Sequence, residues 1–215
     1  MRTVGSSRDK TWPIIRKTGI KLLFKHGFQG MNLRLLASES GLQAGSLYNY
    51  FDNKNEFLAT IVCDIMRELL QEISDALDGE QDPEERLRNF VSVMVTWHTK
   101  RKKEAIVSQS EIRNLPKGRY EELIGLRKEF ELILRKIIDE GVAAGIFRVL
   151  DARLIVVAIL NMLIGIAGWY KPNGRLDVET LVGEYTDIVT KMLSAGKEIE
   201  AARRIRRRVR QVGGT

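Results

Sequence analysis

The sequence contains only one cysteine, two histidines and four prolines in 215 residues. A single cysteine excludes an intramolecular disulfide, and Cys63 lies in an apolar helical pattern typical of a core residue in a reducing compartment. The scarcity of proline and of alternating apolar–polar runs favours an all-α fold. The chain is long enough to bury a core in one large or two small domains.

Residues that catalyse reactions or bind metals are equally sparse. His26 and His98 lie in different predicted helices, so with one cysteine the usual zinc ligand sets cannot be assembled. The sequence has neither a GxxxxGKS/T nor a GxGxxG phosphate loop. A nucleophile–base pair of Ser108 and His98 is conceivable, but no third side chain is placed to orient it. We therefore predict no enzymatic activity, no metal and no cofactor.

Only one long apolar run is present, at residues 154–169. It has sixteen residues, fewer than the roughly twenty that span a bilayer, and Asn161 interrupts it. The N-terminal residues 1–12 lack the apolar segment of a secretory signal. We therefore expect a cytoplasmic protein without a membrane partner, in which this helix is covered by the protein interior or by a second subunit.

Charge is distributed unevenly along the chain. Residues 1–55 have nine Lys/Arg and three Asp/Glu, a balance of +6; residues 56–196 have nineteen and twenty-three, or −4; residues 197–215 have seven and two, or +5. A basic N-terminal part favours a polyanion partner, although basic surfaces are often simply solvated. For the arginine-rich tail, a solvated extension of the last helix and a contact with nucleic acid or an acidic surface both remain open.

Residues 33–57, LRLLASESGLQAGSLYNYFDNKNEF, predict two short helices joined by a tight turn. Leu33, Leu36 and Ala37 have the spacing of one buried helix face, and Asn32 precedes them as an N-cap. Gly41 permits the positive φ that ends a helix and turns the chain. The second helix is predicted over about residues 44–51. This arrangement is the helix-turn-helix, whose second helix can enter a DNA major groove.

Further helices are predicted on both sides of this stretch. A first helix is capped by Thr11, ends at Gly27, and directs inward Ile14, Ile15, Leu22, Leu23 and Phe24. Asn53 caps a long helix that runs to Leu77 and leads from the DNA-binding part into the body. The remaining predicted helices cover residues 83–100, 105–115, 120–144, 151–170 and 177–195.

The N-terminal quarter of the chain, about residues 11–60, resembles the DNA-binding domain of the TetR family of transcriptional repressors. The segments LLFKHGFQG and MNLRLLASESGLQAGSLYNYFDNKNEFL carry the resemblance. Its matching positions are Gly27, Leu36-Ala37, Gly41, Ser46-Leu47-Tyr48, Tyr50-Phe51, Lys54 and Phe57-Leu58. Two positions depart from the family pattern: Gln43 stands where a Ser or Thr cap is common, and Ala44 where a basic or polar residue often lies.

Several side chains of this segment suit the DNA backbone. The hydroxyls of Ser46 and Tyr48 and the ammonium group of Lys54, at a helix N-terminus, are suited to phosphate oxygens. Arg34 is suited to a phosphate or to a guanine edge. The alternative is that Tyr50, and to a lesser extent Tyr48, packs in the domain core with its hydroxyl in water.

Base reading is predicted at the start of the second helix. Gln43 and Asn49 carry amides that can pair with adenine, and Gln43 is the predicted base-reading residue. Ala44 is included in this surface, but it cannot read a base through a hydrogen bond. These departures at Gln43 and Ala44 are where an operator preference is expected to differ from that of relatives.

The resemblance also implies a three-part organisation. It implies a DNA-binding domain at 1–55, an effector-binding and dimerisation domain at 56–196, and the basic tail at 197–215. In the family, the last two helices, here 151–170 and 177–195, pair with their copies in a second subunit. A homodimer places two recognition helices one DNA turn apart, which suits a palindromic operator in double-stranded DNA.

In the TetR family the body encloses a small effector that spreads the two DNA-binding heads. His98 and Glu111 are candidate polar groups in a largely apolar pocket. For each predicted lining residue, an ordinary core position is the open alternative. The predicted lining residues are Met94, Trp97, Val107, Ser108, Glu111, Phe130, Leu134, Asn161 and Trp169.

The body also resembles, more loosely, a branch of TetR regulators that respond to acyl-CoA thioesters. The segments QSEIRNL, GVAAGIFR and WYKPNGRL carry this resemblance. It implies that the basic run at 100–103, or Arg113, holds phosphates of the effector; a solvated helix end is the alternative for that run. The predicted function is a ligand-responsive repressor. The alternative is an effector-independent structural or nucleoid-associated DNA-binding protein of the same fold.

Overall fold

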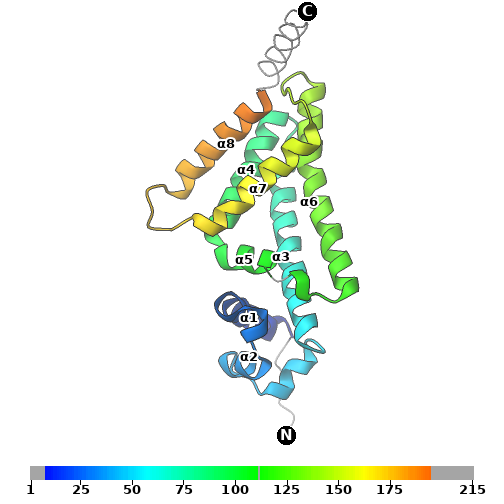
Figure 1. The fold of residues 1–215 in the computed structure, drawn as a ribbon, viewed down its shortest axis with the longest axis vertical. Coiled ribbons are helices and arrows are strands. Elements are labelled where there is room, and N and C mark those ends of the chain that lie inside the picture. The colour runs from blue at the N-terminus through cyan, green and yellow to red at the C-terminus, as the bar shows by residue number, and fades with distance from the viewer. Residues whose placement is uncertain (1–7, 111, 195–215) are drawn as a thin grey trace, which may run out of the picture. The chain divides into compact units, whose positions relative to one another are not determined.

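The computed structural model describes residues 8–110 and 112–194, and within these ranges its regular elements are helices joined by turns and loops (Figure 1). The described residues form eight α-helices, two short 3₁₀ helices and no strand, which confirms the all-α prediction. They divide into two compact units: residues up to Gln71 together with Lys100–Lys128, and Glu72–Thr99 together with the residues from Glu129 onward. The predicted basic tail lies outside the described residues.

The first unit begins with helix α1, Arg8–Gly30, which is broken near its end at Gly27. This glycine has φ 66° and ψ 175°, and beyond it one more turn closes through the amide of Met31, which donates to the Gly27 carbonyl over 3.1 Å. The predicted break at Gly27 is therefore confirmed, and a further turn follows it.

Three predictions about α1 are corrected. Thr11 does not cap the helix, because the helix has already begun at Arg8 and Thr11 is a buried residue of its first turns. Ile14 and Phe24 do not lie in the core of the unit, since their side chains are 52% and 41% exposed. The buried face of α1 is narrower than the apolar pattern suggested, because its inward residues are Ile15, Ile20, Leu22 and Leu23.

Helix α2, Leu33–Glu39, is fixed at both ends by the predicted residues. The side chain of Asn32 accepts a hydrogen bond from the amide of Leu35 at 2.7 Å. After the helix, Gly41 adopts φ 70°, and the amide of Leu42 returns to the carbonyl of Ala37 at 2.9 Å. The turn between the two short helices is therefore formed as predicted.

The second short helix is the 3₁₀ helix η1, Ala44–Asn49, and not the α-helix predicted over 44–51. Its N-cap, Gln43, makes no side-chain hydrogen bond to the helix, and Gly45 in the first turn has low helix propensity. Both features weaken a regular α-helix. The amide of Tyr50 accordingly bonds the carbonyl three residues back, at Leu47, over 2.9 Å.

The long helix α3, Lys54–Leu77, starts at a confirmed cap. The side chain of Asn53 accepts hydrogen bonds from the amides of Asn55 at 2.9 Å and Glu56 at 3.0 Å. Phe57 in its first turn is fully buried against α1, where Gly19 allows the close approach. A Cβ atom at Gly19 would lie 2.2 Å from the Phe57 ring, so any larger residue there would force the ring or one of the two helices to shift.

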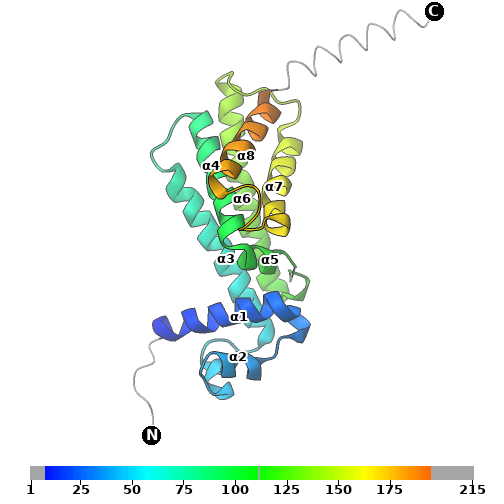
Figure 2. The same cartoon turned by 90° about the vertical axis from the view of Figure 1, so that its left-hand side faces the viewer.

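Residues 100–128 contribute α5 (Lys102–Ser110), the 3₁₀ helix η2 (Ile112–Asn114) and the start of α6 (Lys117–Ala143) to the first unit. Helix α5 lies against α1 (Figure 2). The predicted DNA-binding domain, 1–55, is therefore smaller than the compact unit that contains it. More than seventy residues separate α5 from α1 in the sequence, so their contact could not be predicted from the spacing of apolar residues.

A cluster of four charged residues fastens α1 to α3 and α5. The guanidinium group of Arg16 in α1 pairs with Glu68 of α3 at 3.0 Å and with Glu104 of α5 at 3.3 Å. Arg101, just before α5, pairs with the same two carboxylates. Because the side chains of Arg16 and Glu104 are each only 16% exposed, these contacts are less screened by water than surface ion pairs are.

The second unit has its core between α4, Pro83–Lys100, and the later part of α6. The rings of Phe90 and Phe130 lie 5.7 Å apart between centroids, and both side chains are buried. The chain turns back after α6 so that Phe147 packs over Gly141. A Cβ atom at Gly141 would lie 2.1 Å from the Phe147 ring, which explains why the chain has glycine at this position.

Helices α7, Ala152–Trp169, and α8, Val178–Ser194, lie side by side in the second unit (Figures 1 and 2). Asp151 caps α7, and the observed bounds agree closely with the predicted helices 151–170 and 177–195. Helix α7 is long and apolar enough to cross a membrane by length and composition, with a mean hydropathy of 2.0. A single helix of this kind is weak evidence for a membrane span, since the core helices of water-soluble proteins share these properties.

Candidate DNA-binding surface and effector-binding residues

The helix-turn-helix presents a polar, exposed edge formed by the end of the turn and η1. Gln43, Ala44 and Asn49 are all exposed, and the Tyr48 side chain is 60% exposed. Leu47, between them, is fully buried and anchors η1 to the unit. These predicted DNA contacts therefore share one accessible edge, as groove contact requires.

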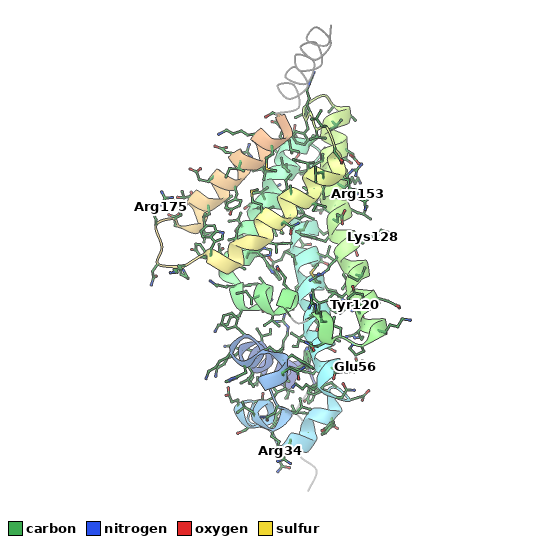
Figure 3. All side chains as sticks on the ribbon, in the orientation of Figure 1. Arg34, Glu56, Tyr120, Lys128, Arg153 and Arg175 are labelled. Carbon is green, nitrogen blue, oxygen red and sulfur yellow. The ribbon has the colours of Figure 1, made fainter. Side chains whose placement is uncertain are left out.

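Arg34 extends this edge from α2. Its side chain is exposed and points away from the ribbon near the lower edge of the view (Figure 3). Gln43 makes no side-chain hydrogen bond to the helix that it precedes, so its amide is not committed to capping. Both side chains are therefore available to a base or a phosphate, in keeping with their predicted roles.

Ser46 and Lys54 are less accessible than predicted for simple phosphate contacts. Both are half-buried. The ammonium group of Lys54 donates to the carbonyl of Gln29 at 3.4 Å and lies 4.5 Å from the centroid of the Phe28 ring. Lys54 thus ties the end of α1 to the start of α3, and its remaining N–H groups are left for an anion.

The two tyrosines of the segment differ in their surroundings. Tyr50 is half-buried, and its ring stacks on that of Trp12 with centroids 6.4 Å apart and an interplanar angle of 17°. This contact supports the packing role considered for Tyr50. Tyr48 has the more open position, which suits a phosphate contact.

An open hollow of about 320 Å³ adjoins η1. Tyr48 and Asn49 line one part of it, and Asp52 and Glu56 contribute carboxylates to the wall. Because these carboxylates repel phosphate, this hollow is not suited to the DNA backbone. Gln43 and Ala44, at the start of η1, do not line this hollow.

Four predicted effector-lining residues belong to the core of the second unit. The side chains of Met94, Trp97, Phe130 and Leu134 are each at most 5% exposed. His98 is also buried there, and its Nδ1 atom lies 2.7 Å from the carbonyl oxygen of Met94. Burial lowers the pKa of His98, so its neutral form is favoured. The interior of this unit is therefore largely apolar, and its buried polar side chains among the described residues are His98, Thr99 and Thr186.

Two further predicted lining residues, Val107 and Ser108, are buried in the first unit. The Ser108 hydroxyl donates to the Ala105 carbonyl of its own helix at 3.0 Å. The carbonyl of Ser108 accepts a hydrogen bond from the guanidinium group of Arg127, in α6, at 3.1 Å. The predicted lining residue Glu111 lies outside the described residues.

The remaining two predicted lining residues do not lie in an interior. Asn161 is exposed on α7, where its amide donates to the Val157 carbonyl one turn earlier at 2.8 Å. Trp169 is 51% exposed at the end of the same helix. Because α7 is apolar on nearly all sides, the sequence did not show which of its faces points outward, and the structure places both side chains at exposed positions.

The basic run 100–103 is not a set of free cations. Arg101 is engaged with Glu68 and Glu104, so a solvated helix end does not describe it, and its guanidinium group is already occupied by carboxylates. Arg113, the other residue considered for phosphates, is exposed in η2. Arg127 is the partly buried cation that sequence reasoning missed, because its surroundings come from α5, distant in sequence.

Among residues 8–110 and 112–194, no group of three or more His, Cys, Asp or Glu side chains is arranged to hold a metal ion. Cys63 is fully buried, as predicted for a core residue, and burial raises the pKa of its thiol. A buried neutral thiol is a poor nucleophile.

A small helix-turn-helix unit with an exposed recognition edge, followed by a helical body, defines a DNA-binding regulator. The sequence matches two family models: that of the bacterial regulatory proteins of the tetR family, over residues 15–61, and the tetracyclin repressor-like C-terminal domain, over residues 80–193. The chain belongs to the TetR family and is a DNA-binding transcriptional repressor of that type.

Individual relatives agree with this assignment. The chain is 28% identical over 165 residues to the HTH-type transcriptional repressor KstR2 of Mycolicibacterium smegmatis. The aligned residues cover 76% of this chain and 80% of the relative. The TetR family transcriptional regulator PfmR from Thermus thermophilus has a similar structure, with 28% identity, a TM-score of 0.76, and coverage of 84% of this chain and 98% of PfmR. AibR, solved in complex with isovaleryl coenzyme A and operator DNA, shares the fold, with 23% identity, a TM-score of 0.75, and coverage of 85% and 97%.

Proposed function

We propose that the protein acts in the cytoplasm as a homodimeric repressor that binds a palindromic operator and releases it when a small apolar effector, such as an acyl-CoA thioester, binds to the body. The observation that carries this proposal is a difference between the two units. The first has an exposed polar edge at the helix-turn-helix, and the second has a buried apolar core. The family membership shown above is in keeping with it.

At the DNA end, the proposed contacts are of two kinds. Gln43 reads a base, and Ala44 offers its methyl group to an apolar base edge such as the thymine methyl. Arg34 and Tyr48 hold phosphates from either side, and Lys54 contributes a partly shared ammonium group. Phosphate contacts position the protein, whereas the contacts at Gln43 and Ala44 select the sequence.

The dimer is proposed to form through α7 and α8. An exposed, largely apolar stripe follows α7 at three- and four-residue spacing, and the small residues in it allow close helix approach. On α8, Ile188 is 42% exposed and extends the apolar surface. A second copy of the chain that covers this surface explains an exposed apolar helix without a membrane. The stripe consists of Leu154, Val157, Ala158, Asn161, Gly165, Gly168 and Trp169.

The effector is proposed to be apolar because the core of the second unit is lined by Met94, Trp97, Phe130 and Leu134. A ligand that enters such an interior recovers the apolar contacts of these side chains. AibR, which shares this fold, was solved with isovaleryl coenzyme A and operator DNA together, and this supports an acyl-CoA as one candidate.

Within the first unit, the charged cluster is the proposed link between effector and DNA. Arg16 connects α1, on which α2 packs, to Glu104 of α5 and Glu68 of α3. A shift of α5 or α3 would therefore move α1 and the recognition edge with it. An effector can drive this shift only to the extent that it binds the released state more tightly.

The direct test is the release of DNA by an effector. Full-length protein is used to enrich a tight-binding duplex from a random-sequence pool, and its affinity is measured by fluorescence anisotropy with decanoyl-CoA, decanoate or no addition. We expect one of the two ligands to weaken DNA binding at least about tenfold, the scale of a typical coupling free energy. Affinity that is the same in all three conditions would count against release by an effector of this class.

A further inference from the structure

Arg127 of α6 differs from the other partly buried arginines in lacking a carboxylate partner. Among the described residues, every other arginine that is not exposed forms an ion pair with Asp or Glu. Burial lowers the pKa of Arg127, which reflects the cost of keeping this charge away from water. A cation in such a position is usually paired, so its lack of a partner requires an explanation. The paired arginines are Arg16, Arg86, Arg101, Arg119 and Arg135.

Most of the hydrogen-bonding capacity of Arg127 is unused. One terminal nitrogen donates to the carbonyl of Ser108, at the end of α5, over 3.1 Å. A guanidinium group has five N–H donors, so this bond uses a small part of its capacity. Three of the paired arginines have an enclosed Nε atom that forms no hydrogen bond, whereas no nitrogen of Arg127 is both enclosed and without a hydrogen bond. Its free donors therefore open onto accessible space.

Two exposed side chains with large apolar parts lie on the helix face beside Arg127. Ile124 and Tyr120 precede it by three and seven residues, so the three side chains lie along one face of α6. Ile124 is 41% exposed and Tyr120 is 43% exposed. Figure 3 marks Tyr120 and Lys128 on α6, on either side of Arg127 along the helix. The face thus places two large, partly apolar side chains one and two turns before the cation.

We propose that Arg127 binds the anionic group, a carboxylate or a phosphate, of an amphiphilic effector, and that Ile124 and Tyr120 contact the part of the effector that adjoins this group. The planar guanidinium group matches two oxygens of either anion, and the pair would neutralise a charge that the fold leaves uncompensated. This inference rests on the proposed function, because it assigns a binding residue and a charge to the proposed effector. Arg127 thus takes the anion-binding role that the resemblance implied for the basic run 100–103, because the guanidinium group of Arg101 is occupied by Glu68 and Glu104.

The competing explanation is structural: Arg127 caps the C-terminal end of α5 through the Ser108 carbonyl. The two roles can be separated by substitution. Arg127→Gln keeps an N–H donor for that carbonyl but removes the charge, and Arg127→Lys keeps the charge but loses the two-pronged geometry. Lys128→Gln is the matched control, since it removes one charge from the next position of the same helix, where the side chain is exposed.

The experiment measures the affinity of the full-length protein for four probes by titration calorimetry: decanoate, decanoyl-CoA, coenzyme A and uncharged methyl decanoate. We expect Arg127→Gln to lower the affinity for the anionic probes about ten- to hundredfold, which is the effect of losing a charged hydrogen bond. Arg127→Lys should lower the same affinities by a smaller factor. Lys128→Gln should change every affinity by less than about threefold, and methyl decanoate should bind all variants equally. The unfolding midpoint without a probe should be alike in all four proteins.

The four probes also identify which anionic group Arg127 binds. An effect on decanoate assigns a carboxylate, whereas an effect on decanoyl-CoA and coenzyme A alone assigns the phosphates; either result supports the role of Arg127. Equal affinities of wild type and Arg127→Gln would overturn it, as would failure of wild type to bind any anionic probe. A lowered midpoint with unchanged affinities would identify a capping role and equally overturn it. Operator binding in the same samples shows separately whether the repressor function stands.

Discussion

At the scale of single residues, the exposed side chains of α2 and η1 that we propose as DNA contacts differ in kind. Arg34 carries a full charge into solvent, whereas Tyr48 offers a neutral hydroxyl. A cation that neutralises a phosphate releases counterions, and a hydroxyl does not. The salt dependence of binding therefore distinguishes the two, and sequence preference distinguishes both from Gln43.

We predict that Arg34→Gln lowers the affinity for all duplex sequences and reduces the slope of log affinity against log salt by about 0.9, the value for one phosphate contact. The measurement is fluorescence anisotropy at several salt concentrations. Arg175→Gln, which removes an exposed charge from the loop before α8, is the control and should leave the slope unchanged. An Arg34→Gln slope equal to that of wild type would exclude the phosphate contact.

His98 gives a prediction about pH. Burial lowers the pKa of His98 in the folded protein, so between this value and the ordinary value of about 6.5 the unfolded chain binds one more proton. Stability is therefore complete above about pH 6.5 and falls as pH falls through the folded pKa, by at most about 1.4 kcal/mol per pH unit for this one group. Urea unfolding at a series of pH values measures this slope.

Two histidine variants test whether His98 causes this dependence of stability on pH. His98→Gln should show a shallower loss of stability below about pH 6.5. His26→Gln changes the other histidine of the chain, which is exposed on α1, and should behave as wild type. Identical slopes in wild type and His98→Gln would contradict the assigned burial effect.

Sequence reasoning succeeded where local chemistry decides and failed where distant segments decide. The cap at Asn32 and the turn at Gly41 follow from side-chain chemistry within a few residues, and both are confirmed. The surroundings of Arg101 depend on Glu68 in another helix, and those of Arg127 depend on α5. Neither could be predicted from periodicity, which gives the face of a helix but not the helix that meets it.

At the scale of elements, helices were predicted more accurately than their partners. The bounds of α3, α7 and α8 follow from apolar spacing, and the start of α3 follows also from the cap at Asn53. The 3₁₀ form of η1 was missed because an uncapped start and an early glycine act together. Helix α5 was predicted as part of the body, but its contacts with α1 make it the support of the DNA-binding unit.

The support role of α5 predicts the effect of Glu104→Gln. Loss of this carboxylate leaves Arg16 and Arg101 to share Glu68 alone, which we expect to destabilise the protein by about 1–3 kcal/mol. Operator affinity should fall as well, because α1 loses its link to α5. Urea unfolding and anisotropy measure the two effects.

Glu121→Gln is the matched control for this cluster. Glu121 is an exposed carboxylate of α6 in the same unit, and its removal should change stability by less than about 0.5 kcal/mol. If Glu104→Gln were as stable as this control, the charged cluster would not fasten α1.

At the scale of the whole molecule, the central question is whether two copies act together. Gly165 lies in the exposed stripe of α7, and no atom lies within 4 Å of a Cβ built there. We predict that Gly165→Arg leaves each subunit folded but yields a monomer by light scattering. Operator affinity should fall by about 10²–10⁴, since binding through two linked heads is lost.

Gly118→Arg provides the control for this substitution. Gly118 is also exposed with open space at its Cβ position, but it lies in α6 of the first unit. The Gly118→Arg protein should remain a dimer with wild-type operator affinity. A dimeric Gly165→Arg protein would place the subunit interface elsewhere.

The measurement that tests the central claim most directly is sequencing of the duplexes that the full-length protein enriches from a random-sequence pool. A dimeric repressor with one recognition edge per subunit should enrich two inverted half-sites whose centres lie one helical turn, about 10 base pairs, apart or a multiple of it. A pool without a preferred sequence, or one enriched in a single half-site without symmetry, would contradict the account.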